Sequence, residues 1–485
     1  MTEVAQLQPS SIWKNFEQLN AVPRPSKKEE RVIQFMVDFG KNLGLETLVD
    51  QIGNVIIKKP ATIGMEDRKT VILQSHLDMV HQKNNDTEFD FDTQGIEMYV
   101  DGDWVRAKGT TLGADNGLGV ATIMAILEST DIAHPTLEAL FTIDEETGMT
   151  GAMKLDGSLL SGEILLNLDT EEDDEIGIGC AGGVDVTASR TYEEENTPEH
   201  VVAYQISVKG LQGGHSGMDI IKGLANANKL MNRLLFDGYI NYGMRIHHLE
   251  GGSLRNAIPR ESEAIVLVDT IHEAAFLDDS QALSEAIKEE FKYLEPNLQI
   301  TISTTNMPQK VMEIGVQEAF TKAIYAAHNG VYRMSPAVEG LVETSNNIAK
   351  ISLANGKIEV ACLSRSSVES SKWDLANALR SSFELAGFEV EASGDYPGWT
   401  PNPDSEILKV VDEIYQQKNG EKANIAACHA GLECGILSEH LPGVDMVSFG
   451  PTIRGAHSPD ERASISSTQK FWELTVAVLE ATPSK

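Results

Sequence analysis

The sequence predicts two domains: an α/β domain with a mostly parallel central sheet flanked by helices, and an inserted α+β domain. Three observations support this fold class. The chain has 485 residues, which is beyond the roughly 250 to 300 at which a single hydrophobic core stops growing. Amphipathic helices alternate with short apolar strands in the first third of the chain, as in α/β domains. The strands and helices that follow are ordered as in an antiparallel sheet covered by helices on one face.

The α/β pattern begins near residue 28. Apolar residues at helical spacing predict helices, and short runs rich in Val, Ile and Leu predict strands buried on both faces, as in a parallel sheet. The predicted elements are a helix over 27–44, strands over 54–59 and 70–80, a helix over 117–130, and strands over 137–143 and 163–169. In such sheets, functional groups collect where strands end and loops begin.

The inserted domain is predicted to span residues 186–395, so that residues 1–185 and 396–485 form one discontinuous domain. A similar succession of strands and helices from about 316 to 392 suggests that the insert contains two related halves. A proline-rich segment near residue 400 is predicted to return the chain to the first domain. The insert's other predicted elements are strands over 201–210, 244–252 and 259–269, and helices over 221–235 and 281–294.

The composition predicts a soluble, cytoplasmic protein. Hydrophobic residues make up 41% of the chain and charged residues 23%, and no apolar run approaches the roughly 18 residues of a membrane helix. The N-terminal segment lacks the basic and apolar regions of a secretory signal. The four cysteines show no C-x-x-C spacing and are expected to be free thiols. A net charge of -34 argues against nucleic acid or an anionic membrane as a partner.

His76 and Asp78 lie near the end of the apolar run VILQSHLDMV and, being two residues apart, point to the same face of a strand. A metal-bound imidazole commonly donates its second ring N–H to a carboxylate. His76 is therefore a candidate ligand, and Asp78 is either its orienting partner or a group beside the metal. An isolated H-x-D pair is more often an ordinary polar strand end, so the pair gains weight only from the other segments.

Two further segments place carboxylates after apolar runs or in glycine-rich turns. Asp115 lies in the turn LGADNGLG just before a helix, where helix capping explains it about as well as metal binding does. Glu145 and Glu146 follow the strand over 137–143 and precede a predicted helix, whose dipole also favours acidic residues. A hydrolytic metal site needs one carboxylate as a ligand and another as a proton acceptor, and these neighbours could divide the two roles.

Asp169 ends the strand over 163–169, and His457 lies far downstream in the loop GPTIRGAHSPDE. Asp169 is the first carboxylate after a buried run, so we expect it at the mouth of that strand. The acidic cluster over 171–175 is interpreted as a solvated loop, because like charges so close together repel in a dry site. A lone loop histidine such as His457 carries little information by itself.

The prediction rests on the whole set of five candidate ligands, which are His76, Asp115, Glu146, Asp169 and His457. The charges suit two Zn²⁺ ions, because three carboxylates and one hydroxide balance four positive charges and neutral histidines complete the site. Two such ions about 3.5 to 4 Å apart lower the pKa of bound water and supply a nucleophile at neutral pH. The sequence therefore predicts a hydrolytic site with two zinc ions.

These segments resemble those of the di-zinc peptidase superfamily that includes carnosinases, aminoacylases and carboxypeptidase G. HLDMV, GADNGLG, DEETG, the strand-terminal Asp169 and GAHSPDE match its five ligand segments in order, across essentially the whole chain. The longer segments GTTLGADNG, CAGG, GGHSG and HAGLECG resemble its branch of bacterial aminoacyl-histidine dipeptidases. The resemblance implies a zinc-peptidase-like catalytic domain with an inserted lid domain, and hydrolysis of Xaa-His and other dipeptides.

By this resemblance, His76 and Asp169 bind one zinc ion, Glu146 and His457 bind the other, and Asp115 bridges the two. Co²⁺ and Mn²⁺ are the alternatives to zinc. The family has a cis peptide bond in the bridging segment, so the bond from Asp115 to the next residue is expected to be cis.

The resemblance also implies catalytic roles. Glu145 would be the general base for attack by the zinc-bridging hydroxide, and Asp78 would orient the first histidine ligand. His215 in GGHSG resembles the lid histidine that stabilises the tetrahedral oxyanion. Asn256 and Arg365 resemble groups that hold the substrate's C-terminal carboxylate, and an arginine fork suits a carboxylate geometrically.

Several questions stay open from the sequence. In some relatives the lid histidine comes from the partner subunit and in others from the same chain, and we expect a homodimer here. His429 and Glu433 in HAGLECG are expected to border the pocket, without an assigned role. The same zinc chemistry would also serve an amidohydrolase acting on N-acyl amino acids or tripeptides. A metal-binding module without turnover is a further alternative, which Glu145 argues against because such a module has no use for a proton acceptor.

Overall fold

The computed structural model describes residues 2–485 and divides into two compact units. The first unit runs to Gly179 and resumes over Pro401–Ala427 and Leu432–Lys485. The second unit consists of Cys180–Thr400 and Cys428–Gly431, so the domain limits predicted at 185/186 and 395/396 fall a few residues inside it. Over the described range 2–485, no helix has the length and apolar character needed to cross a bilayer.

An eight-stranded sheet forms the centre of the first unit, in the order β1-β2-β6-β3-β7-β23-β8-β22. The strands β6, β3, β7 and β23 run parallel to one another, whereas β1, β2 and β8 pair antiparallel with their neighbours. This arrangement confirms the predicted α/β fold with a parallel centre. The strands are β1 (Glu46–Val49), β2 (Val55–Lys59), β3 (Val71–His76), β6 (Leu137–Thr142), β7 (Ile164–Asn167), β8 (Glu175–Cys180), β22 (Asn424–Cys428) and β23 (Asp445–Ser448).

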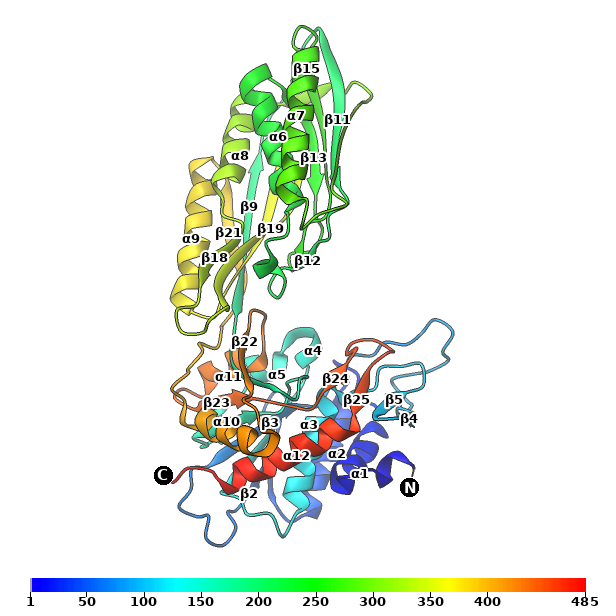
Figure 1. Cartoon of the computed structure of the whole chain (residues 1–485), viewed down its shortest axis with the longest axis vertical. Helices are drawn as coiled ribbons and strands as arrows, with labels where there is room; N and C mark the ends of the chain where they lie inside the picture. The colour runs from blue at the N-terminus through cyan, green and yellow to red at the C-terminus, as the bar shows by residue number, and fades with distance from the viewer. Residues whose placement is uncertain (1) are drawn as a thin grey trace. The chain divides into compact units, whose positions relative to one another are not determined.

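Every residue of β3, β6 and β7 is buried, as expected for strands that are covered on both faces. Helix α3 (Ala114–Glu128) packs against β3, α2 (Glu30–Asn42) against β1 and β2, and α10 (Glu406–Asn419) against β23 (Figure 1). Helix α3 is apolar on all sides and is buried over almost its whole length. The helices predicted over 27–44 and 117–130 correspond to α2 and α3.

A smaller sheet in the first unit has the order β24-β25-β5-β4. Its strands β24 (Ile453–Arg454) and β25 (Arg462–Ser464) bracket the loop that carries His457. The other elements of this unit are η1 (Val4–Gln6), α1 (Ser10–Asn20), β4 (Met98–Asp101), β5 (Trp104–Ala107), α4 (Glu145–Gly148), α5 (Thr150–Met153), η2 (Gly157–Leu159), α11 (Glu433–His440) and α12 (Ile465–Glu480).

A long antiparallel sheet forms the second unit, in the order β16-β11-β15-β13-β19-β20-β9-β21, with β18 paired to β19. Short pairs β10-β17 and β12-β14 accompany it. The strands are β9 (Gly182–Thr191), β10 (Glu194–Asn196), β11 (Val201–Lys209), β12 (Gly214–His215), β13 (Arg245–Gly251), β14 (Ala257–Ile258), β15 (Ser262–Asp269), β16 (Gln299–Thr304), β17 (Lys310–Met312), β18 (Gly330–Met334), β19 (Val342–Ala354), β20 (Lys357–Ser366) and β21 (Glu389–Tyr396).

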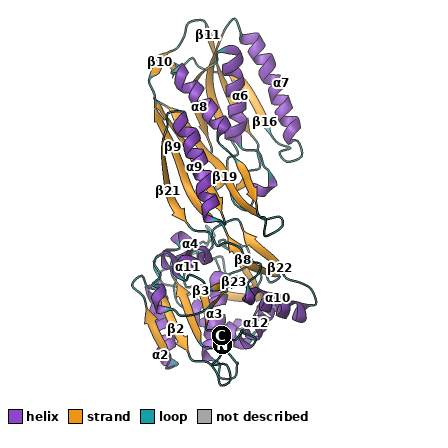
Figure 2. Cartoon of the chain, turned by 90° about the vertical axis from the view of Figure 1, so that its left-hand side faces the viewer, coloured by secondary structure: helices purple, strands orange, loops and turns teal. Residues whose placement is uncertain are grey.

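Helices cover one face of this sheet, as predicted. Along β9, buried Val184, Val186 and Ala188 alternate with half-buried Asp185 and Thr187, which is the pattern of a sheet with one solvated face. Figure 2 shows the long helices packed along the strands. The helices are η3 (Ile220–Lys222), α6 (Ala227–Tyr242), α7 (Glu273–Phe291), α8 (Ile314–Ala326) and α9 (Glu369–Leu385).

The sheet is built from two halves with the same topology, as the sequence suggested. The chain order β11-α6-β13-β15-α7-β16 gives the strand order β16-β11-β15-β13, a βαββαβ unit. The set β9-α8-β19-β20-α9-β21 gives the matching order β21-β9-β20-β19, and β13 pairs with β19 where the halves meet. The second half therefore begins at β9, upstream of the first half, and not near residue 316.

Candidate metal centre

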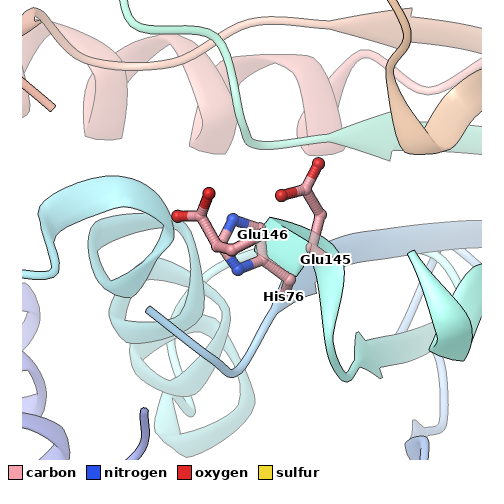
Figure 3. Close-up of side chains that lie close together, drawn as sticks. All are labelled: His76, Glu145 and Glu146. Atoms are coloured by element: carbon pink, nitrogen blue, oxygen red, sulfur yellow. The ribbon is translucent and has the colours of Figure 1, made fainter. Parts of the chain in front are cut away.

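The predicted ligands lie at one edge of the parallel sheet. His76 is the last residue of β3, Glu145 and Glu146 begin α4 shortly after β6, and Asp169 follows β7 by two residues. The carboxyl ends of parallel strands meet at the same edge of a sheet, so neighbouring strands bring these side chains together. Figure 3 shows Glu145 and Glu146 next to the His76 ring, and one ligand atom from each lies within 4.8 Å of the others.

Asp115 enters this cluster from the start of α3. Its backbone and that of Asn116 are not helical, and the Asp115–Asn116 peptide bond is cis, as the resemblance implied. The side chain of Asp115 points its two oxygens at different histidines. Oδ1 lies 3.1 Å from Nε2 of His76, and Oδ2 lies 3.2 Å from Nε2 of His457.

Two groups of possible cation ligands share Asp115. His76, Asp115 and Asp169 form one group, and Asp115, Glu146 and His457 form the other; within each, the ligand atoms lie within 4.8 Å of one another. Nε2 of His76 is 3.6 Å from Oδ1 of Asp169, and Nε2 of His457 is 2.9 Å from Oε2 of Glu146. The five residues that the sequence predicted as ligands are thus brought together as two connected sets.

The donor atoms of these two groups fit divalent cations. Imidazole nitrogens and carboxylate oxygens are the ligands that zinc takes in proteins. Oε1 of Glu146 is buried and has no hydrogen-bond partner among residues 2–485, which is costly for a carboxylate unless a cation fills the place. Hydrogen bonds to the carboxylates of Asp115 and Glu146 raise the pKa of His457 to about 11, because the surroundings are strongly negative.

A further acidic group, formed by Glu29, Asp78 and Asp144, lies in the same unit. Protein donors already satisfy it. Nζ of Lys27 lies 2.9 Å from Asp144, and the hydroxyl of Ser26 donates a hydrogen bond of 2.7 Å to Asp78. Protein donors therefore balance the negative charge of this group, whereas Glu146 in the groups around Asp115 keeps a buried oxygen without a donor.

Asp78 connects the first histidine to the segment that carries the two glutamates. Its backbone oxygen lies 3.1 Å and its carboxylate 3.4 Å from Nδ1 of His76, and the carboxylate accepts hydrogen bonds from the backbone N–H groups of Glu145 and Glu146. Burial alone would raise the pKa of Asp78, but His76 and these hydrogen bonds lower it to about 2. The carboxylate is therefore held ionised in a fixed orientation.

The surroundings of Glu145 disfavour the charged form of its side chain. Burial, together with the negative charges of Glu433, Glu146 and Asp115, raises the pKa of Glu145 to about 8, although His76 acts in the opposite direction. The side chain of Glu145 therefore lies in the same negative surroundings as the two ligand groups.

The predicted residues of the insert form a second cluster, within the second unit. Nη1 of Arg365 donates to the hydroxyl of Tyr396 at 2.8 Å, and its Nε lies 3.4 Å from the hydroxyl oxygen of Ser216. The backbone N–H of Ser216 donates to the carbonyl of Asn256 at 2.8 Å. Next to it, Nδ1 of His215 accepts hydrogen bonds from the backbone N–H groups of residues 217 and 218. The structure thus gathers His215, Asn256 and Arg365 around one short segment.

The two residues singled out in HAGLECG belong to different units. His429 lies in the second unit, where Nε2 is 2.8 Å from the hydroxyl oxygen of Ser345; burial and the charge of Arg365 lower its pKa to about 3. Glu433 lies in the first unit, almost fully buried, and accepts hydrogen bonds from the side chains of Gln74 and Thr142.

One interpretation from the sequence was wrong. The acidic run over 171–175 is not uniformly solvated, because Glu171 is half-buried, and burial together with Asp115 raises its pKa to about 7. Arg24 and Glu461 are also buried beside Asp115 and were not singled out. Glu461 lies within the motif GAHSPDE, which was the one available signal, whereas nothing in the sequence around Arg24 marks it.

Comparison with known proteins extends these observations. The model of "Peptidase family M20/M25/M40" matches residues 72–481. The cytosol non-specific dipeptidase of Escherichia coli (strain K12) is 42% identical over 485 residues, covering 100% of both chains. The crystal structure of aminoacylhistidine dipeptidase from Vibrio alginolyticus has a TM-score of 0.97 and 45% identity, covering 100% of this chain and 99% of that one. Aminopeptidase PepT from Bacillus cereus shares the fold, with a TM-score of 0.57 and 17% identity over 98% of this chain and 99% of that one.

Proposed function

The chain belongs to peptidase family M20/M25/M40, and from that membership we propose that it is a metallodipeptidase that hydrolyses Xaa-His and other dipeptides with the help of two divalent cations. The similarity to a non-specific dipeptidase and to an aminoacylhistidine dipeptidase over the whole chain supports the choice of substrate. The single observation that carries the cation pair is the orientation of Asp115, whose two oxygens face two histidines in separate ligand groups.

In this proposal, His76 and Asp169 hold one cation, Glu146 and His457 hold the other, and Asp115 contacts both. Zinc is the proposed metal, with Co²⁺ and Mn²⁺ as alternatives, because all three accept nitrogen and carboxylate ligands. When bound, a cation pair lowers the pKa of water and polarises a peptide carbonyl.

Glu145 is the proposed general base. It would accept a proton from the attacking water and pass that proton to the departing amine, two transfers that one carboxylate can make in turn. The carboxylate of Asp78 accepts a hydrogen bond of 3.0 Å from the backbone N–H of Glu145 and also contacts His76. It would thereby fix the position of Glu145 relative to His76. Glu146 is proposed as a ligand and not as the base, because its carboxylate contacts His457.

The cluster in the second unit is proposed to bind the rest of the substrate. Arg365 and Asn256 would hold the C-terminal carboxylate, for which a guanidinium fork is geometrically suited. His215 would donate a hydrogen bond to the oxyanion that forms during attack. Burial lowers the pKa of His215, and Arg365 lowers it further; the neutral ring keeps one N–H for such a bond.

Hydrolysis of three substrate classes by the protein loaded with Zn²⁺ tests the proposal. We expect turnover of Xaa-His and other dipeptides, with kcat/KM values well above those for tripeptides and N-acetyl amino acids. Product amino acids would be measured by chromatography and bound metal by elemental analysis on the same samples. Two bound cations with unchanged dipeptides would contradict a peptidase, and a preference for acetylated amino acids would instead identify a deacylase.

A cytosolic location is part of the proposal, because the related Escherichia coli protein is named as cytosolic. The homodimer and the exclusion of nucleic acid and membranes as partners stay predictions from the sequence. Sedimentation of the purified protein would test the dimer.

A further inference from the structure

The buried carboxylate of Glu461 holds the backbone of the segment that ends in Asp115. Glu461 is only 2% exposed. Each of its oxygens accepts two hydrogen bonds from consecutive backbone N–H groups: Leu112 at 2.6 Å and Gly113 at 2.9 Å on Oε2, and Ala114 at 2.8 Å and Asp115 at 3.3 Å on Oε1. These amides lie at the start of α3, where the backbone is not helical and has no partners from the helix itself.

Arg24 holds the same segment from the carbonyl side. Its guanidinium is 1% exposed and donates to the carbonyl of Gly113 at 2.6 Å. It also donates to the carbonyls of Leu77 at 3.0 Å and Asp78 at 3.1 Å, directly after His76. Two buried side chains therefore hold the backbone before Asp115. Glu461 accepts hydrogen bonds from its N–H groups, and Arg24 donates one to the carbonyl of Gly113.

Glu461 also belongs to the loop that carries His457. It follows His457 by four positions, its backbone N–H donates to the carbonyl of Ser458 at 3.0 Å, and the next residue begins β25. A single side chain thus connects the loop of one histidine ligand to the loop of the shared aspartate. Among residues 2–485, no other side chain accepts a hydrogen bond from the backbone N–H groups of 112–115.

We propose that Glu461 is a positioning residue that sets the spacing of the two cation-binding groups, by fixing the loop of Asp115 relative to the loop of His457. This inference rests on the proposed two-cation function. A shift of the backbone at 112–115 would move both oxygens of Asp115 at once. Metal sites tolerate changes in ligand distance of only about 0.2 Å, so both groups would lose affinity. The group of Asp115, Glu146 and His457 would lose most, because its ligands lie on both of the loops that Glu461 connects.

A purely structural role is the competing explanation, and the chain offers a matched control for it. Asp50 is also a buried carboxylate that holds consecutive amides. It accepts hydrogen bonds from the backbone N–H groups of residues 52, 53 and 54, and it lies between β1 and β2, outside the loops that carry Asp115 and His457. Neutralising Asp50 removes comparable hydrogen bonds in the same unit without touching the loops of Asp115 or His457.

The test compares wild type, Glu461→Gln and Asp50→Asn as full-length proteins. Gln is isosteric but presents an NH₂ group to two of the four amides. Each protein is stripped of metal, checked by circular dichroism and its thermal midpoint, and titrated with Zn²⁺ in a competition assay. Co²⁺ is then added, and the magnetic coupling between paired ions is followed by electron paramagnetic resonance. In Glu461→Gln we expect the weaker cation affinity to fall about 10- to 100-fold, as for other groups that orient ligands, and the Co²⁺ coupling to change.

Asp50→Asn should lower the thermal midpoint but leave both affinities and the coupling as in wild type. If Glu461→Gln keeps both cation affinities and the Co²⁺ coupling of wild type, the positioning role is overturned and the proposed function is not affected. The same loss of cation in both variants would overturn it as well, because the effect would then be general destabilisation. A wild type that binds fewer than two cations would overturn the proposed function and this inference with it.

A second variant keeps the test decisive if Glu461→Gln does not fold. Glu461→Asp keeps the charge but shortens the side chain by one methylene group, so it cannot reach all four amides in their present places. We expect it to fold and to show a smaller loss of the weaker cation, with kcat reduced more than KM is raised. Full cation affinity and an unchanged kcat in a folded Glu461→Asp protein would count against the positioning role.

Discussion

The two units hold the predicted site residues in opposite electrostatic settings. In the first unit, Asp115, Glu146 and Asp169 surround two histidines, and the negative surroundings raise the pKa of His457 to about 11. In the second unit, Arg365 lies near His215 and His429 and helps burial to lower their pKa values, although Asp219 acts on His215 in the opposite direction. The first cluster is built to attract cations, whereas the second suits an anion such as a carboxylate.

The clusters also differ in how the chain assembles them. The first depends on loops at the ends of three parallel strands, together with two distant segments that carry Asp115 and His457. The second is held around one short segment near His215 by hydrogen bonds to Arg365 and Asn256. Disturbing the first should therefore affect cation binding and chemistry, while disturbing Arg365 or Asn256 in the second should affect substrate binding.

Glu145→Gln should have the largest effect on activity. The variant loses the proton acceptor but keeps every proposed ligand, so we expect kcat to fall by about 10²- to 10⁴-fold with both cations retained. Steady-state kinetics and metal analysis on one sample would measure this. The neighbouring Glu146→Gln is the contrast, because it should lose cation as well as activity. Retained activity in Glu145→Gln would remove this residue from its role.

Removal of the cations should destabilise the first unit and leave the second unit unchanged. A ligand that binds only the folded state contributes about 4 kcal/mol when present at 1,000 times its Kd. Hydrogen exchange read by mass spectrometry should show faster exchange after chelation in segments around 112–119 and 453–464. Peptides from β11 and β15 serve as the internal control. Equal loss of protection in both units would show that the cations are not confined to the first.

Arg365→Lys should act on substrate binding alone. Lysine keeps the charge but loses the planar fork, so we expect a cost of about 2 kcal/mol, or roughly 30-fold in kcat/KM, seen mainly as a higher KM. Cation content should not change. Arg233→Lys, which alters an exposed ion pair with Glu290 in the same unit, is the matched control. A loss of cation in Arg365→Lys would show that the second cluster also affects cation binding.

The smallest expected effect is a pH dependence of stability in the first unit. His134 is fully buried with Nδ1 2.7 Å from the carbonyl oxygen of Pro135, and burial lowers its pKa. The unfolded chain therefore binds a proton below about pH 6.5 that the folded unit resists, so stability falls as pH drops through that value. His134→Gln should weaken this dependence in urea unfolding between pH 5 and 8, whereas exposed His200→Gln in the second unit should not. Parallel curves for wild type and His134→Gln would contradict the assignment.

Much of the fold was predictable because its signals are local. The apolar runs that end in His76 and Asp169 became fully buried strands, and the family and dipeptidase-like character implied by the motifs are confirmed by the comparisons. The individual roles of the site residues stay predictions. Their convergence was foreseeable because parallel strands end at one edge, and the cis bond after Asp115 followed from the resemblance.

The rest depends on contacts that no local pattern encodes. Arg24 acts through backbone carbonyls of residues far along the chain, so its neighbours in sequence do not mark it. Glu171 was assigned to solvent by counting like charges, but it is half-buried, and burial together with Asp115 raises its pKa. Glu461 lies in a recognised motif, yet its four hydrogen bonds are visible only once residues 112–115 are placed next to it.

The nested order of the two halves of the second unit has a consequence for how the protein is made. As the chain leaves the ribosome, β9 appears early, but its partners β20 and β21 follow only after the entire first half. Both edges of β9 stay open through that interval, while β11 to β16 can already close into a finished sheet of their own. Synthesis thus leaves one long strand with an apolar face exposed to misassociation until residue 396 has emerged.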